Sequence, residues 1–232
     1  MSQSKTQLAA MEGRTLFPKS RKGQGYTSRL LKASANDKVG QVFTWKPWAG
    51  AKIFTLTLEE RATCPRDCQV WNICYGNNMP FAHRISLPHE ELISRIEKET
   101  EENAKKYRKI VYRLHILGDF YSVDYVLFWS NLLAQYPNLY IWGYTANLPD
   151  SAIGQQIVRL NQSYPIADGF SRVLIRFSHN LEHSDGIYSA HTEENIPGSI
   201  VCPEQTGKVS SCGDCGLCMN PKVIKKIQFL KH

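Results

Sequence analysis

The chain has 232 residues with 42% hydrophobic and 21% charged side chains and a net charge of +7, values of an ordinary globular protein. No apolar stretch approaches the roughly 20 residues that a membrane-spanning helix needs, and the first residues lack the apolar core of a secretory signal. We therefore expect a protein of a reducing cytoplasm. There, an odd number of cysteines, seven, favours metal ligation over a disulfide framework.

The positive charge is concentrated in residues 1–50, which hold nine Lys or Arg against Glu12 and Asp37. Interleaved with these bases are aromatic residues: Phe17, Tyr26, Phe43, Trp45 and Trp48. Basic side chains suit the phosphates of a nucleic acid, and aromatic side chains suit its exposed bases. The alternative is a solvated arm whose aromatic side chains pack on the main domain. A smaller basic patch follows the last cysteine: Lys222, Lys225, Lys226 and Lys231.

From residue 52 onward the hydrophobic pattern alternates between strands and helices. Strands are expected at residues 52–58, 110–117, 139–145 and 172–178. Helices are expected from Pro88, from Ser122 to Tyr136, and from Asp150 to about Ser163. This alternation predicts an α/β fold with parallel strands.

We expect the strands to form a partial or compact parallel βα barrel, extended by segments near Ile187 and Ile200. An open doubly wound sheet is the alternative. The expected organisation is a basic aromatic arm (1–50), a barrel-like core (51–198) and a cysteine-rich, metal-stapled tail (199–232).

Polar side chains inside the predicted strands mark a candidate ligand site. With a period of two, Arg113 and His115 share a face with Val111 and Leu117 and point into the barrel lumen. Arg176 and Ser178 share a face of the fourth strand. A buried base is costly unless it is paired or faces a polar ligand. The pattern therefore predicts a site for an anionic substrate, with a structural Arg–Asp pair as the alternative.

The first cysteine cluster, Cys64, Cys68 and Cys74, lies in a polar loop directly after the first strand. Three cysteines hold a four-iron cluster and leave one iron open to an outside ligand. The alternative is a zinc site completed by a histidine such as His83 or His89.

The second cluster is Cys202, Cys212, Cys215 and Cys218, with glycines that permit tight turns. Four thiolates fill a tetrahedral zinc site or bind an auxiliary iron–sulfur cluster. His232 can replace Cys202 in this set. A closed zinc site would stabilise the tail and take no part in chemistry.

Three groups of residues resemble the phage "gene product eighty-eight" family. They are Thr63-Cys-Pro with Cys74-Tyr, Arg113-x-His115-x-x-Gly118-Asp119-Phe120-Tyr-Ser122, and Tyr144-Thr145. The tail from Cys202-Pro203 to His232 is similar too, so the resemblance covers about residue 52 to the end. It implies a phage-encoded protein, located in the host cytoplasm, and supplies no chemistry.

The order of the motifs also resembles the radical S-adenosylmethionine enzymes. In those enzymes three cysteines hold a four-iron cluster, although their usual spacing is three then two residues, whereas here it is three then five. By this resemblance Cys64, Cys68 and Cys74 would hold the cluster. Gly118 and Asp119 would meet the amino group of the cofactor, and Thr145 and Asn147 would line the next strand end.

The leading hypothesis is an iron–sulfur, radical S-adenosylmethionine-like enzyme that acts on a nucleic acid or nucleotide. Arg113, His115 and Arg176 would orient the anionic substrate, and Asp119 would anchor the cofactor. The candidate catalytic residues are Asp119, His115 and Arg113.

Two other hypotheses remain open. Cys212, Cys215, Cys218 and His232 loosely resemble the zinc site of tRNA-guanine transglycosylases, in which case Asp119 would act as nucleophile or base on a guanine. Alternatively, the protein is a non-catalytic, zinc-stapled phage protein that binds nucleic acid.

Overall fold

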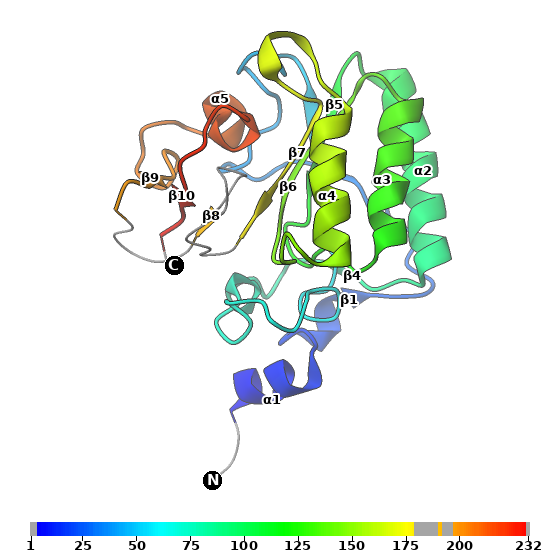
Figure 1. Ribbon diagram of the computed structural model, residues 1–232. Coiled ribbons are helices and arrows are strands. Elements are labelled where there is room, and N and C mark those ends of the chain that lie inside the picture. The colour runs from blue at the N-terminus through cyan, green and yellow to red at the C-terminus, as the bar shows by residue number, and fades with distance from the viewer. Residues whose placement is uncertain (1–3, 179–189, 192–196, 231–232) are drawn as a thin grey trace.

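The computed structural model describes residues 4–178, 190–191 and 197–230. Its centre is a five-stranded sheet in the order β2-β3-β5-β6-β7, in which β2 is antiparallel to β3 and the other strands run parallel (Figure 1). The strands are β2 (Lys32–Ala33), β3 (Lys52–Thr55), β5 (Ile110–Leu114), β6 (Leu139–Thr145) and β7 (Val173–Phe177). The predicted α/β class is therefore confirmed.

Helices α2 (His89–Lys106), α3 (Val123–Gln135) and α4 (Ala152–Ser163) connect consecutive parallel strands and cover one face of the sheet (Figure 1). The sheet ends at β2 on one side and β7 on the other, so within the described residues it is open. The predicted barrel is wrong as to closure, because four parallel strands and one short antiparallel strand leave two edges unpaired. The alternative, a doubly wound sheet, does not occur either, since these three helices share one face.

Local sequence signals set the helix boundaries close to their predicted positions. Ser122 caps α3, its Oγ accepting the N–H of Tyr125 at 3.1 Å. The predicted cap of α4 shifts from Asp150 to Ser151, whose Oγ accepts the N–H of Gly154 at 3.0 Å. A side-chain oxygen that accepts such an N–H satisfies a donor that has no partner inside the helix.

The helix-covered face of the sheet holds the larger hydrophobic core. Ile110, Tyr112 and Leu114 of β5 alternate toward it, as predicted, and all are fully buried. They pack among side chains of all three helices, including Ile96, Trp129 and Leu160. Burial of this apolar area is the main favourable term in folding of the sheet.

The opposite face is covered by the two ends of the chain. Phe43 and Trp48 of the predicted arm pack with Val111, Trp142 and the tail residues Cys218, Met219 and Ile227. The exposed fractions of Phe43 and Trp48 are 1% and 0%. These arm aromatics therefore form part of the core and are not available to a nucleic acid.

Arm and tail also bond to each other through their backbones. The N–H of Cys212 donates to the carbonyl of Lys38 at 2.7 Å, and the N–H of Thr44 donates to the carbonyl of Gly213 at 3.1 Å. A side chain at Gly213 would have its Cβ 2.5 Å from the carbonyl oxygen of Val42, so this approach requires glycine.

The remaining elements lie outside the main sheet. The arm begins with α1 (Lys5–Glu12), which the sequence analysis missed although Ser4 and Gln7 form a capping box. The segment near Ile200 joins a separate three-stranded sheet and does not extend the main one, and Ile187 lies outside the described residues. The other elements are β1 (Arg21–Lys22), β4 (Arg84–Ile85), β8 (Ala190–His191), β9 (Ile200–Val201), β10 (Ile227–Gln228), α5 (Cys212–Cys215), η1 (Pro18–Ser20), η2 (Tyr75–Asn78), η3 (Ala167–Gly169) and η4 (Leu217–Met219).

Candidate cysteine site at the carboxyl edge of the sheet

The first three cysteines lie in one loop, between β3 and η2, at the carboxyl edge of the sheet. Their side chains are half-buried. Burial raises the pKa of each thiol, that of Cys68 to about 11, and the charges of Cys68 and Cys74 raise the pKa of Cys64 further. The pKa of Cys64 therefore depends on both of the other thiols in the loop.

Asp119 lies beside this loop. After burial, its charge is the second-largest contribution that raises the pKa of Cys64, and it also raises that of Cys68. The N–H of Asp119 donates to Thr63 Oγ1, in the residue before Cys64, at 3.1 Å. The loop after β3 and the end of β5 are therefore in direct contact.

Gly118 makes this contact possible. Its φ is +80°, and a Cβ at this position would lie 2.6 Å from both Leu58 Cβ and Thr63 Oγ1. A glycine has no Cβ and adopts positive φ without strain. The cysteine loop can therefore approach the end of β5 only because residue 118 is glycine.

The substitution Gly118→Ala is expected to lower the free energy of unfolding by about 2–3 kcal/mol, since it adds overpacking to backbone strain. The matched control is Gly25→Ala, where φ is +84° but nothing lies within 4 Å of the added Cβ. That control should lose only about 1–2 kcal/mol through strain. Urea unfolding measures both, and equal losses in the two variants would contradict a steric role for Gly118.

The carboxylate of Asp119 binds the end of the neighbouring strand β6. It accepts hydrogen bonds from Thr145 Oγ1 at 2.7 Å, the Ala146 N–H at 2.6 Å and Asn147 Nδ2 at 3.3 Å. The Phe120 N–H donates to it at 2.6 Å. Burial raises the pKa of Asp119 to about 7, and the hydrogen bonds from Ala146, Thr145, Phe120 and Asn147 oppose that rise. The structure thus brings Asp119, Thr145 and Asn147 together, beside Gly118; their assignment to a cofactor stays a prediction.

Two buried arginines fix the shape of the cysteine loop. Arg61, with φ +63°, donates to the carbonyl of Trp71 at 3.0 Å and to Asn77 Oδ1 at 2.8 Å. Arg84 forms a fully buried ion pair with Glu60 at 2.7 Å and donates to the carbonyl of Gly76 at 3.0 Å. Both positive charges lower the pKa of the Cys74 thiol, although burial raises it more.

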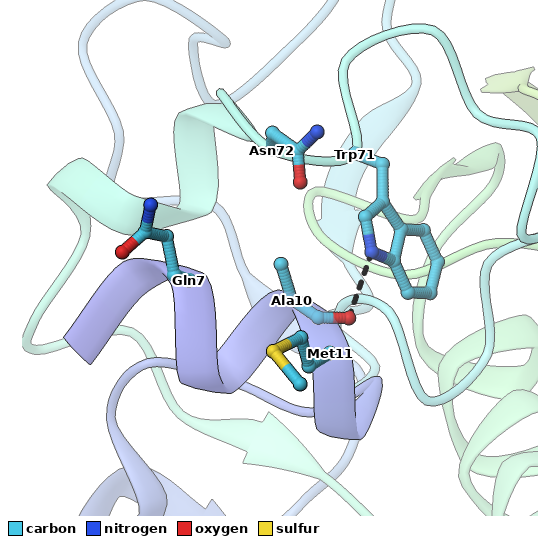
Figure 2. A pocket seen from close by; sticks show the side chains of 5 residues that line it. All are labelled: Gln7, Ala10, Met11, Trp71 and Asn72. Carbon is cyan, nitrogen blue, oxygen red and sulfur yellow. Dashed lines mark hydrogen bonds between the residues drawn. The ribbon is translucent and has the colours of Figure 1, made fainter. Parts of the chain in front are cut away.

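Helix α1 of the arm packs on the outside of the same loop (Figure 2). The indole N–H of Trp71 donates to the carbonyl of Ala10 at 2.9 Å, and the Arg66 guanidinium lies 4.9 Å from the Trp71 ring. A cavity of about 310 Å³ between helix and loop is lined by Gln7, Ala10, Met11, Trp71 and Asn72. No cysteine lines it, so this cavity is separate from the thiols.

The predicted alternation of side chains fails at His115. β5 ends at Leu114, and His115 has φ +47°, so its side chain turns to the helix-covered face. There its Nε2 lies 3.2 Å from the Tyr125 hydroxyl, and burial lowers the pKa of His115 to about 3. The predicted position of His115 inside a lumen, beside Arg113, is therefore wrong.

Arg113 and Arg176 face the side of the sheet that arm and tail cover, but they do not form a common anion site. The Arg113 guanidinium lies 4.7 Å from the Tyr144 ring and donates to the carbonyl of His115 at 3.2 Å. Arg176 is fully buried and donates to tail carbonyls: those of Cys218, Leu217, Asn220 and Val223. Ser178 is half-buried, and its N–H donates to the carbonyl of Thr145 at 2.7 Å. Arg176 thus binds the tail through backbone carbonyls, whereas the structural alternative considered from the sequence was an Arg–Asp pair.

The four cysteines of the tail lie around α5, η4 and the end of β9. Burial raises the pKa of Cys212 to about 12, and the charges of Cys218 and Cys202 raise it further. Cys202 also raises the pKa of Cys215 and Cys218. These four thiols interact electrostatically, whereas His232, the alternative ligand, lies outside the described residues.

In the part of the chain that the structure describes, no group of three or more Cys, His, Asp or Glu side chains has an arrangement that binds a single metal ion. The two histidines considered for a zinc site at the first loop have other partners. His83 Nδ1 lies 2.8 Å from Lys32 Nζ, and His89 Nδ1 lies 2.8 Å from the Tyr121 hydroxyl.

Comparison with known proteins places the chain in a class of phage proteins. The family model "Gene product 88" matches residues 24–158, more than half of the chain, so the protein belongs to this family. The predicted family is confirmed, but the match begins earlier than expected and excludes the tail cysteines.

Two curated relatives are "Gene 88 protein" of Mycobacterium phage L5 and "Gene 88 protein" of Mycobacterium phage D29. The first is 29% identical over 123 residues, which are 47% of this chain and 51% of the relative. The second is 28% identical over 130 residues, 50% of this chain and 53% of the relative. The matched region therefore spans about half the length of these relatives. No solved structure matches, and no helix among the described residues has the length and apolarity to cross a membrane.

Proposed function

We propose that this protein is an iron–sulfur enzyme that uses S-adenosylmethionine and acts on a nucleic acid or nucleotide in the host cytoplasm. Cys64, Cys68 and Cys74 would hold a four-iron cluster. One observation carries the proposal: the three-thiol loop contacts the Gly118–Asp119 end of β5 through Thr63, at the carboxyl edge of a parallel sheet. Ligands of open α/β sheets bind at this edge.

The donor set suits a cluster better than a single zinc ion. A zinc ion needs four ligand atoms on one tetrahedron, with thiolates about 2.3 Å from the metal. The loop supplies three thiolates, and His83 and His89, the histidines considered as a fourth ligand, have other partners. In a four-iron cluster each thiolate binds a different iron, so the sulfur atoms stand further apart and three cysteines suffice.

The residues around the thiols have distinct functions in this proposal. Metal ligation requires thiolates, and the charges of Arg61 and Arg84 assist the loss of the proton from Cys74. Asp119 would hold the amino group of the cofactor in place of its longest present hydrogen bond, that from Asn147 Nδ2 at 3.3 Å, while Thr145 Oγ1 orients the Asp119 carboxylate at 2.7 Å. When bound, the reduced cluster supplies the electron that cleaves S-adenosylmethionine.

The proposal predicts about four irons per chain in the loop cluster of anaerobically reconstituted protein, with about four more if the tail holds an auxiliary four-iron cluster. The variants Cys64→Ser, Cys68→Ser and Cys74→Ser should each lose the four irons of the loop, because two thiolates do not retain the cluster. The matched control, Cys215→Ser, removes a tail thiol and should keep the irons of the loop. Asp119→Asn should keep the iron but lose reductive cleavage of S-adenosylmethionine.

Iron content and cleavage are measured by metal analysis, the visible spectrum and chromatography of the products after dithionite reduction. Colourless wild-type protein that holds only zinc would contradict the proposal. So would loop variants that each hold as much iron as the wild type.

For the tail we propose a separate structural centre held by Cys202, Cys212, Cys215 and Cys218, zinc or an auxiliary iron–sulfur cluster. Its support is the spacing of the last three cysteines, two successive C-x-x-C steps in α5 and η4. The four thiols would have to come together when a zinc ion binds, since the described residues hold no assembled single-ion site. His232 remains the alternative to Cys202.

A non-catalytic protein that binds nucleic acid is the second candidate. It is favoured because Arg176 and His115, candidates for substrate binding, contact other parts of the protein instead. A transglycosylase-like zinc enzyme has less support, since it gives no function to the loop of Cys64, Cys68 and Cys74. Purified protein that contains only zinc would favour these two candidates over the iron–sulfur enzyme.

A further inference from the structure

A basic surface lies next to the cysteine loop, away from the buried arm aromatics. It consists of Lys22, Lys32 and His83 with the aromatic side chains of Tyr26 and Phe81; we name these five residues the 22/83 patch. Lys32 Nζ lies 2.8 Å from His83 Nδ1, and the Tyr26 hydroxyl lies 3.4 Å from the same atom. Lys32 and Tyr26 thus contact His83, and the charge of Lys22 lowers the pKa of His83, so four of the five residues interact.

Backbone pairing holds the patch in place. β1 pairs in parallel with β4, with Lys22 opposite Ile85, and the N–H of Ser86 donates to the carbonyl of Lys22 at 3.0 Å. His83 and Phe81 come directly before β4 in the chain. The arm therefore contributes Lys22, Tyr26 and Lys32, and the segment after the cysteine loop contributes the rest.

The two lysines of the patch carry unneutralised charge. Neighbouring arginines are paired: Arg21 with Glu59 at 2.8 Å, and Arg84 with Glu60 at 2.7 Å. Within the described residues neither Lys22 nor Lys32 forms an ion pair with a carboxylate. Burial and the charges of Lys32 and Lys22 lower the pKa of His83. The local field is therefore positive and attracts anions.

His83 and Phe81 add a donor and a stacking surface. Because His83 Nδ1 accepts from Lys32, the neutral ring carries its proton on Nε2 and can donate it. Phe81 is 93% exposed, the highest fraction among the exposed large hydrophobic residues. Phe81 lies two residues before His83 in the chain, and an exposed phenyl ring suits a strand whose bases are unpaired, because any base stacks on it.

We infer that the 22/83 patch binds single-stranded nucleic acid, with Lys22, Lys32 and His83 on the phosphates and Phe81 against a base. Arg84 connects the patch to the thiols: it follows His83 in the chain, and its guanidinium donates to Gly76, two residues after Cys74. A bound strand would thus lie beside the cysteine loop. The inference names the substrate class of the proposed enzyme and rests on that proposal, but its test needs no metal.

The test is fluorescence anisotropy of labelled 20-nucleotide oligo(dT) and oligo(U) with the full-length protein, over a series of salt concentrations. The double variant Lys22→Ala/Lys32→Ala should bind more weakly, with the slope of log K against log salt reduced by about 1.4, the value for two single-strand phosphate contacts. Phe81→Ala should weaken binding about fivefold or more, and Phe81→Trp should restore it. The two oligomers distinguish DNA from RNA as the source of the strand.

The matched control is Lys98→Ala/Lys105→Ala, which removes the same charge from the exposed surface of α2. It should leave the slope within experimental error of the wild type. Three results would overturn the inference: no binding by the wild type, equal losses in both double variants, or tighter binding to duplex than to single strands. Loss of iron in the cysteine variants with binding intact would separate this surface from the cluster.

Discussion

The variant Arg176→Met is expected to lower the free energy of unfolding by about 3–5 kcal/mol. Arg176 is fully buried on β7, and its guanidinium donates to Cys218 at 2.8 Å, Asn220 at 3.0 Å, Leu217 at 3.2 Å and Val223 at 3.4 Å, all backbone carbonyls. Methionine fills similar space but donates no hydrogen bond, so these acceptors lose their partner. A hydrogen bond to a charged group contributes about 1.5–3 kcal/mol, and buried acceptors without partners add their desolvation cost.

Urea unfolding and hydrogen exchange of the tail amides measure the effect of Arg176→Met. The matched control is Arg172→Met, which removes an arginine that binds the carbonyls of Leu133, Tyr136 and Leu139, away from the tail. It should lose stability but keep the exchange protection of residues 217–228. Full tail protection in Arg176→Met would contradict the role assigned to this arginine.

The variant Arg84→Met is expected to cost about 3–5 kcal/mol, because it leaves the carboxylate of Glu60 buried without its countercharge. Arg84 and Glu60 are 0% and 1% exposed, and their ion pair measures 2.7 Å. Arg84 also donates to Ser20 Oγ and to the carbonyl of Ala82, each at 2.8 Å, so arm and loop lose contacts too.

The double variant Glu60→Leu/Arg84→Met supplies the control for the buried charge. Replacing both members of a buried pair by apolar side chains is often neutral or stabilising, so this variant should recover much of the loss. Chemical unfolding of both variants at the same pH measures the free energy of unfolding that each one loses. A double variant that is less stable than Arg84→Met would show that the hydrogen bonds, not the unpaired charge, dominate.

Much of the fold could be predicted because local patterns determine it. The strand at residues 139–145 and the helix after Ser122 follow from apolar periodicity and a capping serine, and both occur as predicted. The meeting of Asp119 with Thr145 and Asn147 follows from topology, since the ends of neighbouring parallel strands share one edge.

The features that were missed depend on contacts distant in the sequence. The side chain of His115 turns away from Arg113 because His115 has a positive φ, which the residue type alone does not predict. The partners of Arg176 lie more than 40 residues away, in a tail whose position the sequence pattern does not give. Barrel closure depends on strand number and register, and period-two alternation carries no information about either.

Because α2, α3 and α4 cover one face of the sheet, its other face depends on other segments of the chain for cover. Residues 24–158 match the family, yet they omit β7 and every tail residue that covers Trp142 and Val111. A fragment that ends at those limits would leave the β6 edge unpaired. It would also expose aromatic side chains to water on the uncovered face of the sheet. In this chain, residues 24–158 therefore do not form a complete folding unit, because β7 and the tail supply one edge of the sheet and the cover of that face.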